Sequence, residues 1–137
     1  RDADEETFAV LEQYEFECRS LWPANRPLGV MHCYAGDLNL AMRYVNLGFV
    51  ISISATVTYP AAHQTREVAA SIPLRSLAVE TDSPYLPPQS IRGQRNEPAR
   101  VRDVAEYIAR LRGISYEELA QSTALNTQRL FGLEAAG

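Results

Sequence analysis

The segment LGVMHCY (28–34) is a short apolar run bounded by proline and glycine, which is typical of a buried β-strand. FVISIS (49–54) is β-branched and alternating, and SLAVET (76–81) is a third short strand-like run. One helical segment separates each strand from the next, over residues 38–47 and 61–71. Because each helix returns the chain to the same end of the sheet, this order requires parallel strands. The sequence therefore predicts an α/β fold of consecutive βα units.

Apolar periodicity and end signals place the helices. Asp37 is suited to cap the helix over 38–47, and Gly48 is suited to end it. Further helices are predicted over residues 3–17, 98–112, 115–123 and 125–131. The apolar face predicted for the first of these consists of Thr7, Leu11, Tyr14 and Cys18. The face predicted for the helix over 98–112 consists of Val101, Val104, Ala105, Ile108 and Leu111.

Composition limits the class of protein. With 137 residues, of which 46% are hydrophobic and 22% charged, the chain is long enough for one domain, predicted over 1–137. These proportions exclude a disordered or fibrous chain, and no apolar run approaches the roughly 20 residues that span a bilayer. The acidic start RDADEE is the reverse of a cationic signal peptide, and Cys18 and Cys33 form no disulfide framework. We therefore expect a cytoplasmic protein with free thiols and no membrane contact.

Charge is unevenly distributed along the chain. The formal net charge is −4, and all 13 basic residues are arginine. Seven acidic residues fall within residues 1–20, whereas six arginines fall within residues 92–112. A protein that binds nucleic acid by bulk electrostatics is usually basic, so any contact with nucleic acid here must be local.

Three parallel strands cannot close a barrel by themselves. An α/β barrel needs eight βα units and roughly 250 residues. The number of strands therefore predicts that the chain is part of something larger or assembles with another copy.

The first strand carries a histidine near its carboxyl end. Because side chains alternate along a strand, His32 and Tyr34 are predicted to share one face, and Met31 and Cys33 the opposite face, towards the helices. In a barrel the face opposite the helices is the lumen, and the carboxyl ends of the strands build the active site. A lone histidine on a strand is a structural hydrogen-bonding residue or a metal ligand. His63, in a polar stretch, is predicted to lie on the surface.

Two carboxylates follow the third strand. Asp82 lies two residues after Glu80, so both side chains are predicted to point the same way. Such a pair at the end of an apolar strand is costly to bury unless cations or hydrogen bonds meet it. Asp82 either caps the turn that follows it or, with His32 from another strand end, shares a divalent ion.

A proline-rich loop over residues 81–98 is longer than loops usually run, and long loops in compact domains are often functional. It contains Arg92, Arg95 and Asn96. Arginine beside a metal centre suits phosphate, because the guanidinium binds two oxygens at once. The alternative is that these are solubilising loop charges.

Five stretches together resemble the C-terminal half of the TatD family of metal-dependent hydrolases and deoxyribonucleases. They are GVMHCYAG (29–36), GFVISIS (48–54), VETDSPYLPP (79–88), RGQRNEP (92–98) and NTQRLFGL (126–133). The resemblance implies that residues 1–137 are the C-terminal portion of a (β/α)8 barrel of the metallo-dependent hydrolase type, with its last three strands. The N-terminal half of that barrel is absent.

The resemblance also implies an activity and residues that carry it. Such proteins hold one or two divalent ions at the carboxyl mouth of the barrel and cleave DNA phosphodiesters, often from the 3′ end. Mg²⁺ is the expected ion, with Zn²⁺ or Mn²⁺ as alternatives. By resemblance, His32 and Asp82 are metal ligands, and Asp82 is the general base for the attacking water. Arg92 and Asn96 match motif positions, and we infer that they bind substrate phosphate.

The other metal ligands of the family have no counterpart in this sequence. Two ligands rarely make a tight site for a hard divalent ion, so we expect the chain alone to be a weak or inactive catalyst. The missing half of the barrel or a second copy is expected to cover the sheet edges. The alternatives are a barrel hydrolase of small esters or amides, and a non-catalytic half-barrel that serves as a binding or assembly module.

Overall fold

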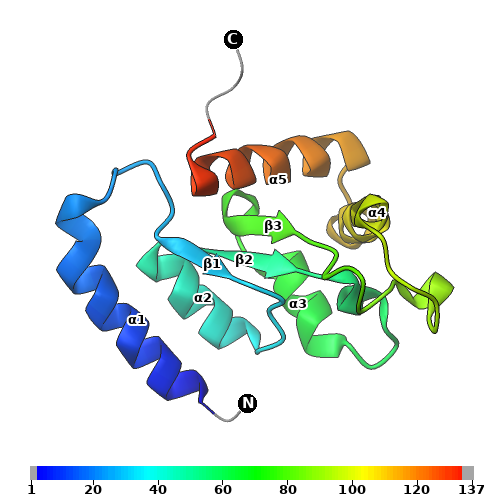
Figure 1. Cartoon of the computed structure of the whole chain (residues 1–137), viewed down its shortest axis with the longest axis horizontal. Helices are drawn as coiled ribbons and strands as arrows, with labels where there is room; N and C mark the ends of the chain where they lie inside the picture. Colours follow the sequence, from blue (N-terminus) through cyan, green and yellow to red (C-terminus); the bar gives the residue numbers. More distant parts are fainter. Residues whose placement is uncertain (1–2, 134–137) are drawn as a thin grey trace.

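The structure, a computed structural model, describes residues 3–133 (Figure 1). Its elements follow the chain in the order α1 (Asp4–Cys18), β1 (Gly29–Met31), α2 (Leu38–Leu47), β2 (Phe49–Ile53), α3 (His63–Ser71), β3 (Leu77–Val79), α4 (Val101–Arg112) and α5 (Tyr116–Phe131). Short 3-10 helices join several of these elements. Within the described residues, no helix is both long enough and apolar enough to cross a membrane.

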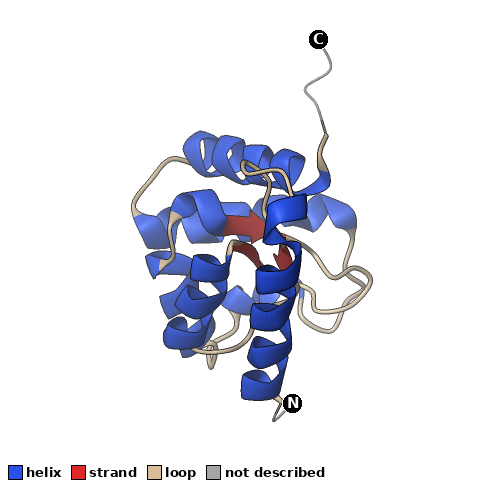
Figure 2. Ribbon diagram, turned by 90° about the vertical axis from the view of Figure 1, so that its left-hand side faces the viewer, coloured by secondary structure: helices blue, strands red, loops and turns tan. Residues whose placement is uncertain are grey.

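The three strands form one parallel sheet in the order β1–β2–β3, which confirms the predicted α/β fold. Val30 is paired with Val50, and Ser52 with Ala78, so the strands run in step and end at the same edge. The sheet lies among the helices (Figure 2). In the described part of the chain, the outer edges of β1 and β3 have no neighbouring strand. Each strand is shorter than the run of sequence that predicted it.

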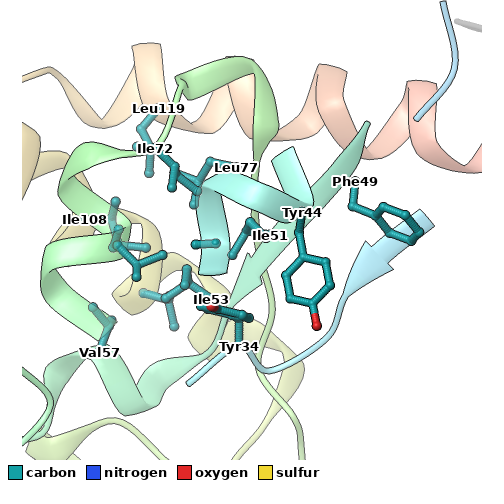
Figure 3. Close-up of a cluster of buried hydrophobic side chains, with 14 of the residues drawn as sticks. Tyr34, Tyr44, Phe49, Ile51, Ile53, Val57, Ile72, Leu77, Ile108 and Leu119 are labelled. Atoms are coloured by element: carbon teal, nitrogen blue, oxygen red, sulfur yellow. The ribbon is translucent and has the colours of Figure 1, made fainter. Parts of the chain in front are cut away.

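The central strand β2 is buried along its whole length and lies in the hydrophobic core (Figure 3). Ile51 and Ile53 are fully enclosed. The ring of Tyr44 on α2 has its centroid 6.4 Å from that of Phe49 and 6.3 Å from that of Tyr34. Each large apolar side chain buried in this way contributes about 1.5–3 kcal/mol. The position of β2 is therefore fixed by packing as well as by its two strand neighbours.

Both predicted end signals of α2 are confirmed. Asp37 Oδ1 accepts a hydrogen bond from the Leu40 N–H at 2.8 Å. Gly48 ends the helix with a φ of 97°, in the left-handed region that glycine adopts without steric cost. Because β2 begins at the next residue, this stop determines where the central strand starts.

The prediction of two helices over 115–123 and 125–131 is wrong. One continuous helix, α5, covers both segments. It contains neither glycine nor proline, so nothing in its backbone requires a break. At its start, the Ser115 hydroxyl accepts a hydrogen bond from the Glu118 N–H at 3.0 Å, which is one half of a capping box.

Two predicted apolar faces differ in detail from the structure. In α1 the buried residue is Phe8, whereas Tyr14 of the predicted face is 36% exposed. This helix lies at one end of the molecule and packs against α2, so most of its surface faces solvent (Figure 1). In α4 the predicted face holds for Val104 and Ile108, but Leu111 is 37% exposed.

Ile108→Ala tests the packing of α4 on the core. Ile108 is fully buried, so its truncation leaves a cavity and should lower the free energy of unfolding by about 2–5 kcal/mol. Leu125→Ala is the matched control, because Leu125 is 50% exposed and its truncation should change stability by less than about 0.5 kcal/mol. Urea unfolding followed by circular dichroism measures both, and equal losses would contradict this packing.

Candidate metal centre

Three polar side chains meet at the carboxyl ends of the outer strands. His32 follows β1 directly, and Glu80 and Asp82 follow β3. One ligand atom from each residue can be chosen so that all three atoms lie within 4.8 Å of one another. The structure therefore brings the two predicted ligands, His32 and Asp82, into one cluster with a third residue.

The imidazole of His32 lies between the two carboxylates. Its Nδ1 is 3.0 Å from Glu80 Oε2 and 2.9 Å from Glu80 Oε1, and its Nε2 is 3.4 Å from Asp82 Oδ1. The backbone N–H of Cys33 donates a second hydrogen bond to Glu80 Oε2 at 3.2 Å. When Nδ1 carries the proton and donates it to Glu80, the lone pair of Nε2 points towards Asp82. Glu80 thus orients His32 as outer carboxylates orient metal-binding histidines.

Burial differs sharply among the three side chains. That of His32 is 66% exposed, whereas those of Glu80 and Asp82 are 16% and 30% exposed. Glu80 Oε1 is itself buried, and apart from its 2.9 Å contact with His32 Nδ1 it has no hydrogen-bond partner among the described residues. A buried carboxylate oxygen without a hydrogen bond is costly unless a positive charge lies nearby. His32 Nε2 and the Asp82 carboxylate, beside the negative charge of Glu80, therefore fit a divalent cation.

The backbone turns sharply beside the site. Cys33 and Asp82 have φ values of 47° and 57°, a left-handed conformation that is uncommon for residues other than glycine. The turn at Cys33 ends the alternation of β1, so the prediction that Tyr34 shares a face with His32 is wrong. Tyr34 is buried and packs against Tyr44 of α2.

Cys33 was predicted to pack against the helices, and the structure places its thiol elsewhere. Its Sγ donates a hydrogen bond to Ser54 Oγ at 3.3 Å, directly after β2. Burial raises the pKa of the Cys33 thiol, and the nearby charges of Glu80 and Asp82 raise it further. A neutral thiol beside two carboxylates adds no charge to the site.

Asp82 could alternatively have capped the turn that follows it, but the side chain of Thr81 makes those hydrogen bonds. Thr81 Oγ1 accepts hydrogen bonds from the backbone N–H and the hydroxyl of Ser83, at 3.3 and 3.0 Å. The turn itself closes through the backbone, from the Tyr85 N–H to the Asp82 carbonyl at 2.9 Å. The carboxylate of Asp82 is therefore left to face His32.

Asn96 has a different role from the predicted phosphate contact. It is 1% exposed, and its amide NH₂ donates to the carbonyls of Thr81, Tyr85 and Leu86 at 2.7, 2.7 and 3.3 Å. Its Oδ1 accepts from the N–H of the next residue at 2.9 Å. With its polar atoms occupied inside the loop, Asn96 holds the segment that carries Asp82 and has no free donor for a phosphate.

Arg92 is exposed on the same loop. Its guanidinium lies over the ring of Tyr59, 4.3 Å from the ring centroid. The Tyr59 hydroxyl donates to the Pro87 carbonyl at 2.9 Å, which fixes the ring on which Arg92 stacks. Over residues 3–133, no hydrogen bond or ion pair joins Arg92 to the three-residue cluster, so its contact with phosphate stays a prediction.

Glu80 is the site residue that sequence reasoning left out. Its placement on the same side as Asp82 was expected, but its contact with His32 was not. The spacing of Glu80 and Asp82 could have indicated this role, because a carboxylate two residues before a ligand lies on the same face of a strand. What the sequence lacks is the distance between the ends of β1 and β3, which the sheet alone determines.

A parallel sheet whose strand ends aim one histidine and two carboxylates at a common point defines an α/β protein with a metal-type site. The chain belongs to the family described as TatD related DNase, whose family model matches residues 1–132. This confirms the resemblance drawn from the sequence motifs.

Individual relatives agree with this membership. The chain is 47% identical over 137 residues to the uncharacterized metal-dependent hydrolase YcfH of Escherichia coli, covering 99% of this chain and 48% of YcfH. It is 37% identical over 131 residues to the uncharacterized metal-dependent hydrolase YabD of Bacillus subtilis, covering 96% and 48%. The crystal structure of YjjV, a TatD homologue from Escherichia coli, superposes with a TM-score of 0.84 at 34% identity, covering 98% and 48%. The chain thus spans about half the length of these relatives.

Zn²⁺ or Mn²⁺ titration tests the cluster directly. Glu80→Ala removes the group that orients His32 and should weaken ion binding by about 10- to 100-fold, as loss of such partners does elsewhere. His32→Ala should weaken it at least as much. His63→Ala is the matched control, because His63 is exposed on α3 and lies outside the cluster. If calorimetry shows that all three variants bind the ion as tightly as the parent chain does, the assignment of the cluster as a metal site is wrong.

Asn96→Ala tests the role of Asn96 in the loop. The substitution leaves three carbonyls without their donor, so the free energy of unfolding should fall by about 1–3 kcal/mol. Gln94→Ala, at an exposed position of the same loop, should have almost no effect. Thermal unfolding compares the two, and equal melting temperatures would show that Asn96 does not hold the loop.

Proposed function

We propose that this protein acts as a metal-dependent hydrolase that cleaves phosphodiester bonds in DNA as an exonuclease. The observation that carries the proposal is the cluster of His32, Glu80 and Asp82 at the carboxyl ends of parallel strands. Membership of the TatD related DNase family supports the same chemistry. The relatives' names go only as far as metal-dependent hydrolase, so DNA as the substrate is part of the proposal.

The proposal includes a barrel of which the three strands are one section. In α/β barrels the active site lies at the carboxyl ends of the strands, which is where His32 and Asp82 lie. The free edges of β1 and β3 offer unpaired backbone groups to further strands. Hard divalent ions prefer six or more ligands, and of this cluster only His32 and Asp82 would hold the ion directly. We infer that polypeptide beyond this chain, from a longer protein or a second copy, supplies the rest.

Each residue of the cluster has a distinct role in this mechanism. A divalent ion bound there would neutralise charge on the phosphodiester and lower the pKa of a water. His32 Nε2 and the Asp82 carboxylate would hold the ion, and Asp82 Oδ1 accepts the proton of the attacking water. Glu80 keeps the proton on His32 Nδ1, so that Nε2 stays available. Asp82 is the catalytic residue, and Glu80 is a positioning residue.

The substrate contact follows from the distribution of charge. An overall net charge of −4 gives no general attraction for DNA, so binding depends on local arginines. Arg92 is exposed on the loop that begins at Asp82, and Tyr59 holds its guanidinium in place. A guanidinium presented in this way can bind two oxygens of one phosphate.

A DNA degradation assay tests the proposal in two proteins. The first is the 137-residue chain. The second is a chimera in which this chain replaces the matching 48% of YcfH, which restores the length of a complete relative. With Mg²⁺, Mn²⁺ or Zn²⁺ added, we expect little activity from the chain and stepwise shortening of end-labelled DNA by the chimera. Chelation should abolish the activity, and Asp82→Asn should reduce it by at least about 100-fold, since it removes the general base.

The controls separate the alternatives. His63→Ala in the chimera should leave the rate unchanged. A chimera that hydrolyses a chromogenic ester but not DNA would replace this proposal with a small-molecule hydrolase. A chimera that is folded by circular dichroism and inert towards both substrates would favour a binding or assembly module.

A further inference from the structure

Four arginines surround a pocket of about 200 Å³ at the amino-terminal ends of the strands, opposite the metal centre. They are Arg19, Arg26, Arg75 and Arg129, and we call their cavity the arginine pocket. Of the described residues that line it, none is acidic. We propose that the arginine pocket binds a phosphate-type oxyanion.

Arg26 is held in place from two sides. Its guanidinium stacks over the indole of Trp22, 5.2 Å from the ring centroid. Its Nε donates to the Leu130 carbonyl at 3.1 Å. This bond joins the segment before β1 to the last turn of α5, which lie side by side in Figure 1. The bond uses Nε, and none of the described residues accepts a hydrogen bond from the two terminal nitrogens.

Arg129 is fixed by a chain of hydrogen bonds that reaches the sheet. Its Nη2 donates to Asn126 Oδ1. The Asn126 amide, buried, donates in turn to the carbonyls of Leu74 and Leu77, each at 2.7 Å. Arg75 lies between these two carbonyls in the sequence and also lines the pocket. The last turn of α5 and the start of β3 therefore present their arginines to one cavity.

Arg19 faces the glycine that ends α2. A Cβ added at Gly48 would lie 3.3 Å from both Nη atoms of Arg19, so a side chain there would crowd the guanidinium. The Nε of Arg19 pairs with Glu15 Oε1 at 3.1 Å. Over residues 3–133, no carboxylate pairs with Arg26, Arg75 or Arg129. None of the described residues therefore neutralises three of the four positive charges around the pocket.

The size and charge of the pocket define its ligand. Like charges gathered around one cavity repel one another, and a bound anion removes that cost. Guanidinium groups bind phosphate oxygens in pairs, with bonds about twice as strong as neutral ones. Pockets for drug-sized ligands measure roughly 300–1,000 Å³, so a cavity of about 200 Å³ suits one phosphate group rather than a whole nucleotide.

This pocket is separate from the proposed catalytic site. It is lined by residues at the start of β2 and just before β3, whereas the metal cluster follows the ends of β1 and β3. The five residues of β2 span about 16 Å at roughly 3.3 Å per residue. A phosphate here is therefore not the one being cleaved. It comes either from free inorganic phosphate or from the backbone of a DNA strand that extends around the molecule.

Calorimetric titration of the 137-residue chain with inorganic phosphate at low ionic strength tests the proposal. Arg75→Gln is the main variant, because the Arg75 side chain is exposed and makes no hydrogen bond to the described residues, so the fold loses nothing. It should weaken phosphate binding about tenfold, the effect of losing one charge-assisted hydrogen bond. Arg129→Gln should weaken it to a similar extent. Arg110→Gln, an exposed arginine on α4 outside the pocket, is the control.

The outcomes are distinct. Specific weakening by Arg75→Gln and Arg129→Gln, with Arg110→Gln unchanged, supports the proposal. No phosphate binding, or equal weakening by all three variants, overturns it, because general electrostatic attraction would then account for the effect. A short oligothymidylate without terminal phosphates distinguishes the sources. If Arg75→Gln weakens its binding too, the ligand is backbone phosphate, and if only inorganic phosphate is affected, the ligand is the free ion. None of these results depends on DNA cleavage.

Discussion

Parallel pairing on both sides of β2 is the constraint on which the site depends. Residues 32 and 80 lie 48 positions apart, and only the sheet register brings them together. Met31 is paired with Ile51 and Val79 with Ile53, so β1 and β3 end along the same edge of the sheet. Since β2 is buried along its whole length, a shift of its register by one residue would exchange its two packed faces and disrupt the core on both sides. The core thus fixes the separation between the histidine and the two carboxylates.

At that edge the backbone departs from regular strand geometry, and the polar side chains of the cluster point towards one another. Both Cys33 and Asp82 adopt left-handed backbone conformations, which cost free energy for residues that have a Cβ. The hydrogen bonds of the buried Asn96 amide hold the second of these turns in place. At the same place, a buried oxygen of Glu80 makes no hydrogen bond to the described residues beyond its contact with His32. Strain and an unmet polar group at one edge of an otherwise well-packed sheet are typical of a functional site.

Sequence reasoning succeeded where a local signal decides the structure. The apolar run FVISIS, the Asp37 cap and the Gly48 stop each act within a few residues, and each was predicted correctly. It failed where a contact between residues far apart in the sequence, or a single backbone angle, determines the direction of a side chain. The positive φ of Cys33 turns Tyr34 away from the predicted face, and a positive φ cannot be predicted from cysteine as a residue type. The burial of Asn96 depends on three carbonyls brought close by the loop, so its motif position alone suggested an exposed role.

The two ends of the sheet carry opposite charge, which the net charge of −4 conceals. Carboxylates gather at the carboxyl ends, where the proposed cation would bind, and four arginines gather at the amino ends. A DNA strand drawn to the first end would meet the repulsion of Glu80 and Asp82 unless a divalent ion had already bound there. Binding of the ion would therefore precede binding of the substrate, and the negative charge of Glu80 and Asp82 would exclude DNA from a site without the ion. For the proposed cleavage of DNA this order would be useful, because it would allow the polyanion to enter only a site that already holds its ion.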